Sequence, residues 1–188
     1  MRLLLTTRSS PMADCSVFSA LPDDASLWIH TADASLEGAT QTALLNRLSE
    51  FMETWTSHQH PVHGAATVLH DRFLVVAAAS DGPDDISGCG IDALTHAIDD
   101  AAVALGLSWV PALHVLYRAP DGTVTAVPRR VFQQRAEEGL LTLETPVFDP
   151  SLCTLGALRA GRLERPARAS WHAQLLPDAA PAPHTADA

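Results

Sequence analysis

The chain has 188 residues, of which 47% are hydrophobic and 18% charged, and its formal net charge is −10. This composition suits one globular domain. All 12 basic residues are Arg and none is Lys. A P-loop, a Schiff-base lysine and a lysine general base are therefore excluded, because each needs a lysine side chain. The acidic balance also argues against nucleic-acid binding, since phosphate backbones repel it.

The first expected elements are a strand and a long helix. Residues 26–32 alternate as a strand, with Trp28 and His30 on one face. Ser35 is a suitable N-cap for the helix. The apolar stripe of this helix recurs at helical spacing and consists of Leu44, Leu48, Phe51 and Trp55. Residues on this stripe are expected in the core.

Three more strands and a second helix follow. We expect a proline-containing loop over 58–64, a strand over 67–70, and over 73–79 an apolar central strand that is covered on at least one face. Residues 81–90 contain helix breakers and predict a loop. A helix over 91–105 then ends at Gly106. The next strand, 114–118, leads through the Asp121-Gly122 turn into residues 123–127.

The order up to residue 118 is β-α-β-β-α-β, which predicts an α+β, ferredoxin-like split βαβ domain over residues 13–120. Residues 121–176 are expected to form a C-terminal extension that packs on its antiparallel sheet. Residues 177–188 contain only small, polar and proline residues apart from acidic Asp178 and Asp187, and are expected to be a disordered tail.

This topology makes a prediction about the two ends of the sheet. The histidines after the first helix, His58, His60 and His63, are expected at the same end as the loop over 81–90. The opposite end is expected to gather His30 and residues 70–72.

Several segments resemble an uncharacterised bacterial family whose members often carry the name "ABC transporter ATPase". The matching segments are LPDDASLWIHTAD (21–33), FMETWTSH (51–58), DRFLV (71–75), SGCGID (87–92), TPVF (145–148) and SWH (170–172). The chain departs from the family at Gly90, Gln59 and residues 149–151. The resemblance runs from about Ala13 to Leu175, and the family start lines up best with Met12. This implies that residues 1–12 are a mis-annotated or disordered leader. The inherited name is not supported, because the chain has no G-x-x-x-x-G-K-[ST] pattern.

Cys89 is the sharpest candidate for chemistry. It lies between two glycines just before a helix, where free backbone N–H groups and the helix dipole favour a thiolate. His58 as base and Asp92 or Asp85 as orienting carboxylate would complete a Cys-His-Asp arrangement for hydrolysis or acyl transfer. The alternative is a packing cysteine in a glycine-allowed turn, with Ser87 or Asp92 as an ordinary helix cap.

The other candidate sites are supported by weaker sequence signals. Ser87, Gly88, Trp55 and Arg118 are candidate binding residues. His58, His60 and His63 could ligate a transition metal, but H-x-H-x-x-H on a loop lacks the fixed spacing of a metal motif, and solvated histidines are favoured. We therefore predict no metal and no cofactor.

The sequence leaves two function classes open. One is a cytoplasmic binding or regulatory module that self-associates through a sheet face or an edge strand, which leaves a homo-oligomer open. The other is a thiol-dependent enzyme. Three cysteines without CxxC spacing favour a reducing compartment, and no apolar run reaches the roughly 20 residues of a membrane span. Because no complete catalytic motif is present, the module is favoured.

The missing lysine predicts a response to salt. Codon bias explains the absence of lysine, and so does an acidic surface adapted to high salt; we expect both to contribute. In that case thermal unfolding should shift upward as KCl rises to molar concentrations. An unfolding temperature that does not rise with KCl would contradict the halophilic interpretation.

Overall fold

Residues 15–177 are described by a computed structural model, in which the chain forms two compact units. The first unit contains the described residues up to Val110 together with Asp149–Leu163. The second contains Pro111–Phe148 and the described residues from Glu164 onward. This division differs from the expected boundary at residue 120. The expected leader, 1–12, lies outside the described residues, as does the expected tail except for Pro177.

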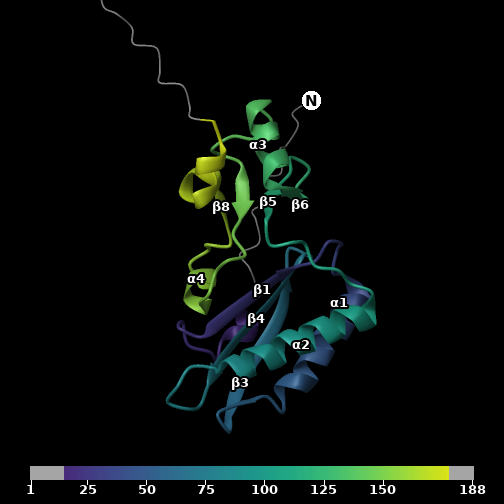
Figure 1. The fold of residues 1–188 in the computed structure, drawn as a ribbon, viewed down its shortest axis with the longest axis vertical. Coiled ribbons are helices and arrows are strands. Elements are labelled where there is room, and N and C mark those ends of the chain that lie inside the picture. Colours follow the sequence, from purple (N-terminus) through teal and green to yellow (C-terminus); the bar gives the residue numbers. More distant parts are fainter. Residues whose placement is uncertain (1–14, 178–188) are drawn as a thin grey trace, which may run out of the picture. The chain divides into compact units, whose positions relative to one another are not determined.

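The first unit is a four-stranded antiparallel sheet with helices. Its elements are the 3-10 turn η1 (Ser16–Phe18), β1 (Ser26–Thr31), α1 (Gly38–Met52), β2 (Thr56–Ser57), β3 (His60–Leu69), β4 (Phe73–Ser80), α2 (Gly88–Leu105) and α4 (Leu155–Arg159). The strand order is β1-β4-β3-β2. Figure 1 shows α1 and α2 side by side, and together they cover one face of the sheet.

The central strand β4 is buried on both faces, in agreement with its continuous apolar sequence. Leu74, Val76 and Ala78 join the core beneath α1 and α2. Phe73, Val75 and Ala77 alternate with them, so they point to the other face, and all three are fully buried. On that face η1 packs against β3, and Arg159 of α4 donates to the carbonyls of Phe18 and Leu21 at 2.8 and 3.0 Å.

The α+β class is confirmed, but the ferredoxin-like order is not. As expected, β4 lies between β1 and β3 and is antiparallel to both. The predicted fourth strand, β5 (His114–Arg118), instead pairs with β6 and β7 of a second sheet. After α2 the chain does reach the outer edge of β1, where Trp109 bridges Ala32. Val110 donates to the carbonyl of Thr31 at 2.7 Å, and this short pairing ends before β5 begins.

The second unit has its own antiparallel sheet, in the order β6-β5-β7-β8. Its other elements are β6 (Val124–Pro128), α3 (Arg129–Glu137), β7 (Pro146–Phe148), β8 (Glu164–Pro166), η2 (Ala167–Ala169) and η3 (Trp171–Leu175). The buried residues of its core include Val115, Tyr117, Phe132, Val147 and Leu175. Residues beyond 121 thus bury a core with the help of β5, which the sequence analysis had assigned to the other sheet.

Arg118 ties β5 to β8 within this unit. Its Nε and Nη2 donate to the two carboxylate oxygens of Glu164 at 2.6 and 2.7 Å, and its Nη1 donates to the carbonyl of Gly122 at 2.7 Å. The guanidinium also stands 5.1 Å from the ring centroid of Phe148. The hydrogen bonds that Arg118 donates to the Glu164 carboxylate raise the pKa of Arg118. These contacts give Arg118, a candidate binding residue, a structural role.

Removing this charge pair should destabilise the chain measurably. Glu164→Gln keeps the size of the side chain but removes a half-buried carboxylate, and we expect a loss of about 1.5–3 kcal/mol in urea unfolding. The exposed pair Glu144–Arg168 provides a matched control, and Glu144→Gln should cost less than about 1 kcal/mol. Equal losses for the two variants would contradict a structural role for Arg118.

Candidate functional site

The N-terminus of α2 is fastened to β2 by two pairs of residues, Ser57–Ser87 and Trp55–Gly90, which we call the anchor. Ser57 Oγ accepts the backbone N–H of Ser87 at 2.8 Å and donates to Ser87 Oγ at 3.2 Å. Trp55 Nε1 donates to the carbonyl of Gly90 at 3.1 Å. Both β2-side residues are buried, with exposed fractions of 4% for Trp55 and 3% for Ser57.

The SGCG segment has a structural explanation at two of its positions. Ser87 is the N-cap of α2, and its Oγ accepts the N–H of Gly90 at 3.2 Å, which confirms the expected cap. A Cβ on Gly90 would lie 3.0 Å from Ile86 Cγ2, so a side chain there would force its neighbour to shift. Gly88 has open space around it and does not share this constraint.

A tight hairpin follows the anchor, where the sequence analysis expected a loop over 58–64. His58 and Gln59, with φ of 50° and 67°, form a two-residue turn, and β3 begins at His60. Two positive φ values are typical of a type I′ turn, which usually selects Asn-Gly. The loop expectation was wrong because Pro61 was read as a breaker, although an edge pairing tolerates proline.

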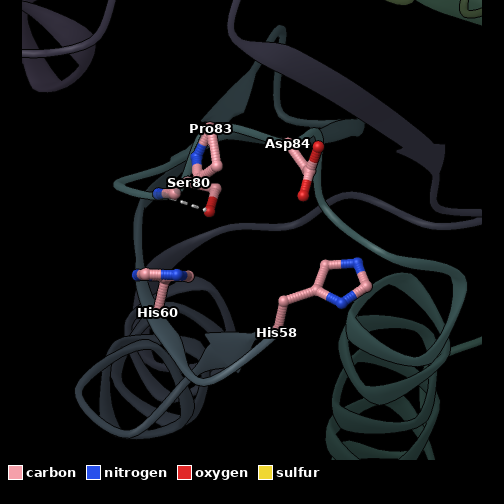
Figure 2. A pocket seen from close by; sticks show the side chains of 6 residues that line it. His58, His60, Ser80, Pro83 and Asp84 are labelled. Carbon is pink, nitrogen blue, oxygen red and sulfur yellow. Dashed lines mark hydrogen bonds between the residues drawn. The ribbon is translucent and has the colours of Figure 1, made fainter.

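A hollow of about 240 Å³ opens between this turn and the loop after β4. We call it the hairpin hollow; it is lined by His58, His60, Ser80, Gly82, Pro83 and Asp84. Figure 2 shows His58 and His60 rising from the hairpin on one side, with Ser80, Pro83 and Asp84 across from them. Gly82 shapes this wall, because a Cβ there would lie 2.9 Å from the His60 ring.

Of the polar side chains that line the hairpin hollow, Ser80 Oγ accepts the backbone N–H of Gly82 at 3.1 Å. No hydrogen bond or ion pair joins His58, His60 or Asp84 to another described residue. The nearby His63 differs, because its Nε2 lies 2.8 Å from Asp81 Oδ2. A second hollow of about 240 Å³ lies beside the first and shares Ser80, Gly82, Pro83 and Asp84 with it.

The predicted grouping of residues at the two ends of the sheet is confirmed. His58 and His60, which follow the first helix, lie against the loop after β4, since they line the hairpin hollow together with residues of that loop. At the other end Arg72 Nε donates to the carbonyl of Ala32 at 2.8 Å, and Asp71 accepts from Leu36 at 2.7 Å. His30 packs against Trp109 there, with ring centroids 5.4 Å apart. Burial lowers the pKa of His30, while the charge of Asp99 acts in the opposite direction.

The three candidate catalytic residues are not joined into a catalytic arrangement within residues 15–177. Cys89 lies in the first turn of α2 and is exposed. It neither lines the hairpin hollow nor shares a hydrogen bond with His58 or Asp92. Asp92 is also exposed, and its backbone carbonyl accepts a hydrogen bond from His96 Nδ1 at 2.8 Å. His58 is therefore brought to a hollow that Cys89 does not enter.

No group of three or more His, Cys, Asp or Glu side chains within the described residues is arranged to hold a metal ion. Of the three histidines considered as ligands, His58 and His60 line the hairpin hollow and His63 faces Asp81.

Sequence reasoning placed His58, His60 and the loop over 81–90 at one end of the sheet, but it did not identify Ser80, Gly82, Pro83 and Asp84 as the lining of one hollow. The available signal was the Asp81-Gly82-Pro83 turn directly after an apolar strand, since loops at strand ends often carry binding residues.

Comparisons with protein-family models, curated proteins and solved structures found no match for this chain. Among the described residues, no helix combines the length and apolar character needed to cross a membrane.

The anchor generates a prediction about stability. Ser57→Ala removes the acceptor of the half-buried Ser87 N–H, and we expect a loss of about 1–3 kcal/mol in urea unfolding. Ser49→Ala, on the exposed face of α1, is the control and should be within about 0.5 kcal/mol of the parent chain. A Ser57→Ala variant as stable as the control would show that the anchor does not hold α2.

Proposed function

We propose that this protein is a non-catalytic binding module whose ligand site is the hairpin hollow. The observation that carries the proposal is the set of three unpartnered polar side chains, His58, His60 and Asp84, which face one space from two different loops. Polar groups that converge on a hollow without protein partners are typical of ligand sites. The hollow is smaller than the sites of drug-sized ligands, so the ligand is small.

The chemistry of the lining narrows the ligand class. An imidazole offers an N–H donor, whereas a carboxylate accepts hydrogen bonds. His58 and His60 therefore suit an acceptor group, such as a ligand carboxylate, and Asp84 suits a donor, such as an ammonium group. A small ligand that carries both groups fits this pairing better than one with only an anionic or only a cationic group.

Backbone strain supports a role for the hairpin. His58 and Gln59 occupy left-handed positions that are costly for residues other than glycine, and such strain is often retained at binding sites. His70 and Asp71 have the same left-handed conformation at the opposite end of the sheet, where the Asp71 carbonyl accepts the N–H of Leu36. The strain at His58 and Gln59 therefore supports the proposed site but does not carry the proposal.

The thiol-dependent enzyme is the weaker alternative, because Cys89 and His58 do not share the hollow. The same proposal assigns the protein to the cytoplasm, which suits a chain with three cysteines and no CxxC spacing.

The proposal is tested by NMR titration of the histidine side chains with acetate, methylammonium and glycine at equal ionic strength. We expect glycine, which carries both charged groups, to shift the His58 and His60 imidazole signals saturably and to leave exposed His96 unchanged. Asp84→Asn should abolish the response, whereas Asp85→Asn, outside this hollow, should preserve it. Equal shifts at all histidines, or no shift with any probe, would contradict the proposed site.

Alkylation with iodoacetamide decides between the module and the enzyme. The module predicts that Cys89 reacts no faster than exposed Cys153 and that His58→Ala leaves its rate unchanged. A Cys89 that reacts much faster than Cys153, and that slows in His58→Ala, would favour the thiol enzyme instead.

A further inference from the structure

Within residues 15–177, the outer edge of β3 is unpaired along most of its length. The short strand β2 pairs only with His60 and Pro61, and the N–H of Val62 then donates to the carbonyl of Trp55 at 3.0 Å. Because backbone groups alternate in direction along a strand, Gly64, Ala66 and Val68 direct their N–H and C=O groups to this same side. No hydrogen bond to another described residue occupies them.

The other edge of the same sheet is treated differently. On the outer side of β1, Leu27 donates to the carbonyl of Cys153 at 3.0 Å, and Val110 donates to the carbonyl of Thr31 at 2.7 Å. Loop segments therefore cover both ends of that edge. Between Gly64 and Leu69, no other described residue pairs with this edge of β3, and this stretch lacks proline and charged side chains, which are the usual devices that prevent strand pairing.

We propose that the β3 edge pairs with the β3 edge of a second copy of this chain, forming a two-fold dimer with one continuous sheet. This inference concerns a different surface from the ligand site and stands independently of it. An antiparallel pairing centred on Ala66 places Ala66 opposite Ala66 of the other copy, and Val68 opposite Gly64. Each such pair exchanges two N–H···O=C hydrogen bonds.

The side chains along this edge are self-complementary. On the helix-covered face, the side chains of Met52 and Trp55 pack closely over Gly64, with Met52 Sδ 3.2 Å from a Cβ built at Gly64. In the centred register, Val68 of one copy meets this apolar shelf on the other. On the opposite face, Ala65 lies across from Thr67, and neither side chain is charged.

Charge also favours a second copy at this position. Two chains with a net charge of −10 repel each other, so contact is least costly where carboxylates are absent. No Asp or Glu occurs between Glu53 and Asp71, an interval that contains all of β3. A two-fold axis through Ala66 therefore brings no acidic side chains of β3 together. It also closes the assembly at two copies, because both open edges are used.

Sedimentation equilibrium of the full chain over a dilution series tests the dimer. We expect a mass of twice 20.0 kDa at high concentration, falling toward 20.0 kDa on dilution. Ala66→Pro removes an outward N–H without removing a bond to β4, so it should yield the monomer mass with unchanged circular dichroism. A parent chain that is monomeric throughout, or a folded Ala66→Pro that still dimerises, would overturn the proposal.

A charge variant and an amide measurement cover the case in which Ala66→Pro fails to fold. Thr67→Glu places like charges near each other across the two-fold axis and should favour the monomer, whereas Thr95→Glu on the exposed face of α2 should not. In hydrogen exchange of the parent chain, the Ala66 amide should gain protection with concentration, while the Ala65 amide, directed to β4, stays protected throughout. Concentration-independent exchange at Ala66 would overturn the proposal, whatever the outcome of the ligand titrations.

Discussion

The arrangement of the first unit depends on the anchor between β2 and the start of α2. Ser57 accepts the N–H of Ser87, and Trp55 donates to the carbonyl of Gly90, so a two-residue strand holds the N-terminus of an 18-residue helix. Buried backbone groups need partners, and Ser57 Oγ supplies one for the N–H of Ser87, which precedes the helix and has no acceptor within it. The turn at His58 and the loop after β4 are thereby held on either side of one hollow.

The same anchor explains why Cys89, the candidate nucleophile, and His58, the candidate base, do not line the same hollow. Ser87 and Gly90 direct their backbone groups toward β2, which fixes the orientation of the first turn of α2. Cys89 is exposed on that turn, while His58 lies in the hairpin that leads into β3. The two residues share one end of the sheet, yet only His58 lines the hollow. Placement of two residues at the same end of a sheet is therefore not sufficient to form a catalytic pair.

Sequence patterns predicted the elements with strong periodicity and the end of the sheet at which they meet. The apolar run of β4, the Ser87 cap and the Gly106 helix end were recovered because each depends on local chemistry. The sheet that β5 joins was not predicted, since alternation in His114–Arg118 suits any antiparallel sheet, and the choice depends on distant residues such as Glu164. The hairpin at His58 was missed because its turn lacks the usual Asn-Gly signal.

Native-state hydrogen exchange at the start of α2 tests the anchor most directly. The amides of Ser87 and Gly90 are hydrogen-bonded to side chains of the anchor, whereas those of Gly88 and Cys89, between them in sequence, have no acceptor among the described residues. The account predicts strong protection at Ser87 and Gly90 and fast exchange at Gly88 and Cys89. Fast exchange at all four amides would show that β2 does not hold the helix, and would contradict the account of the site.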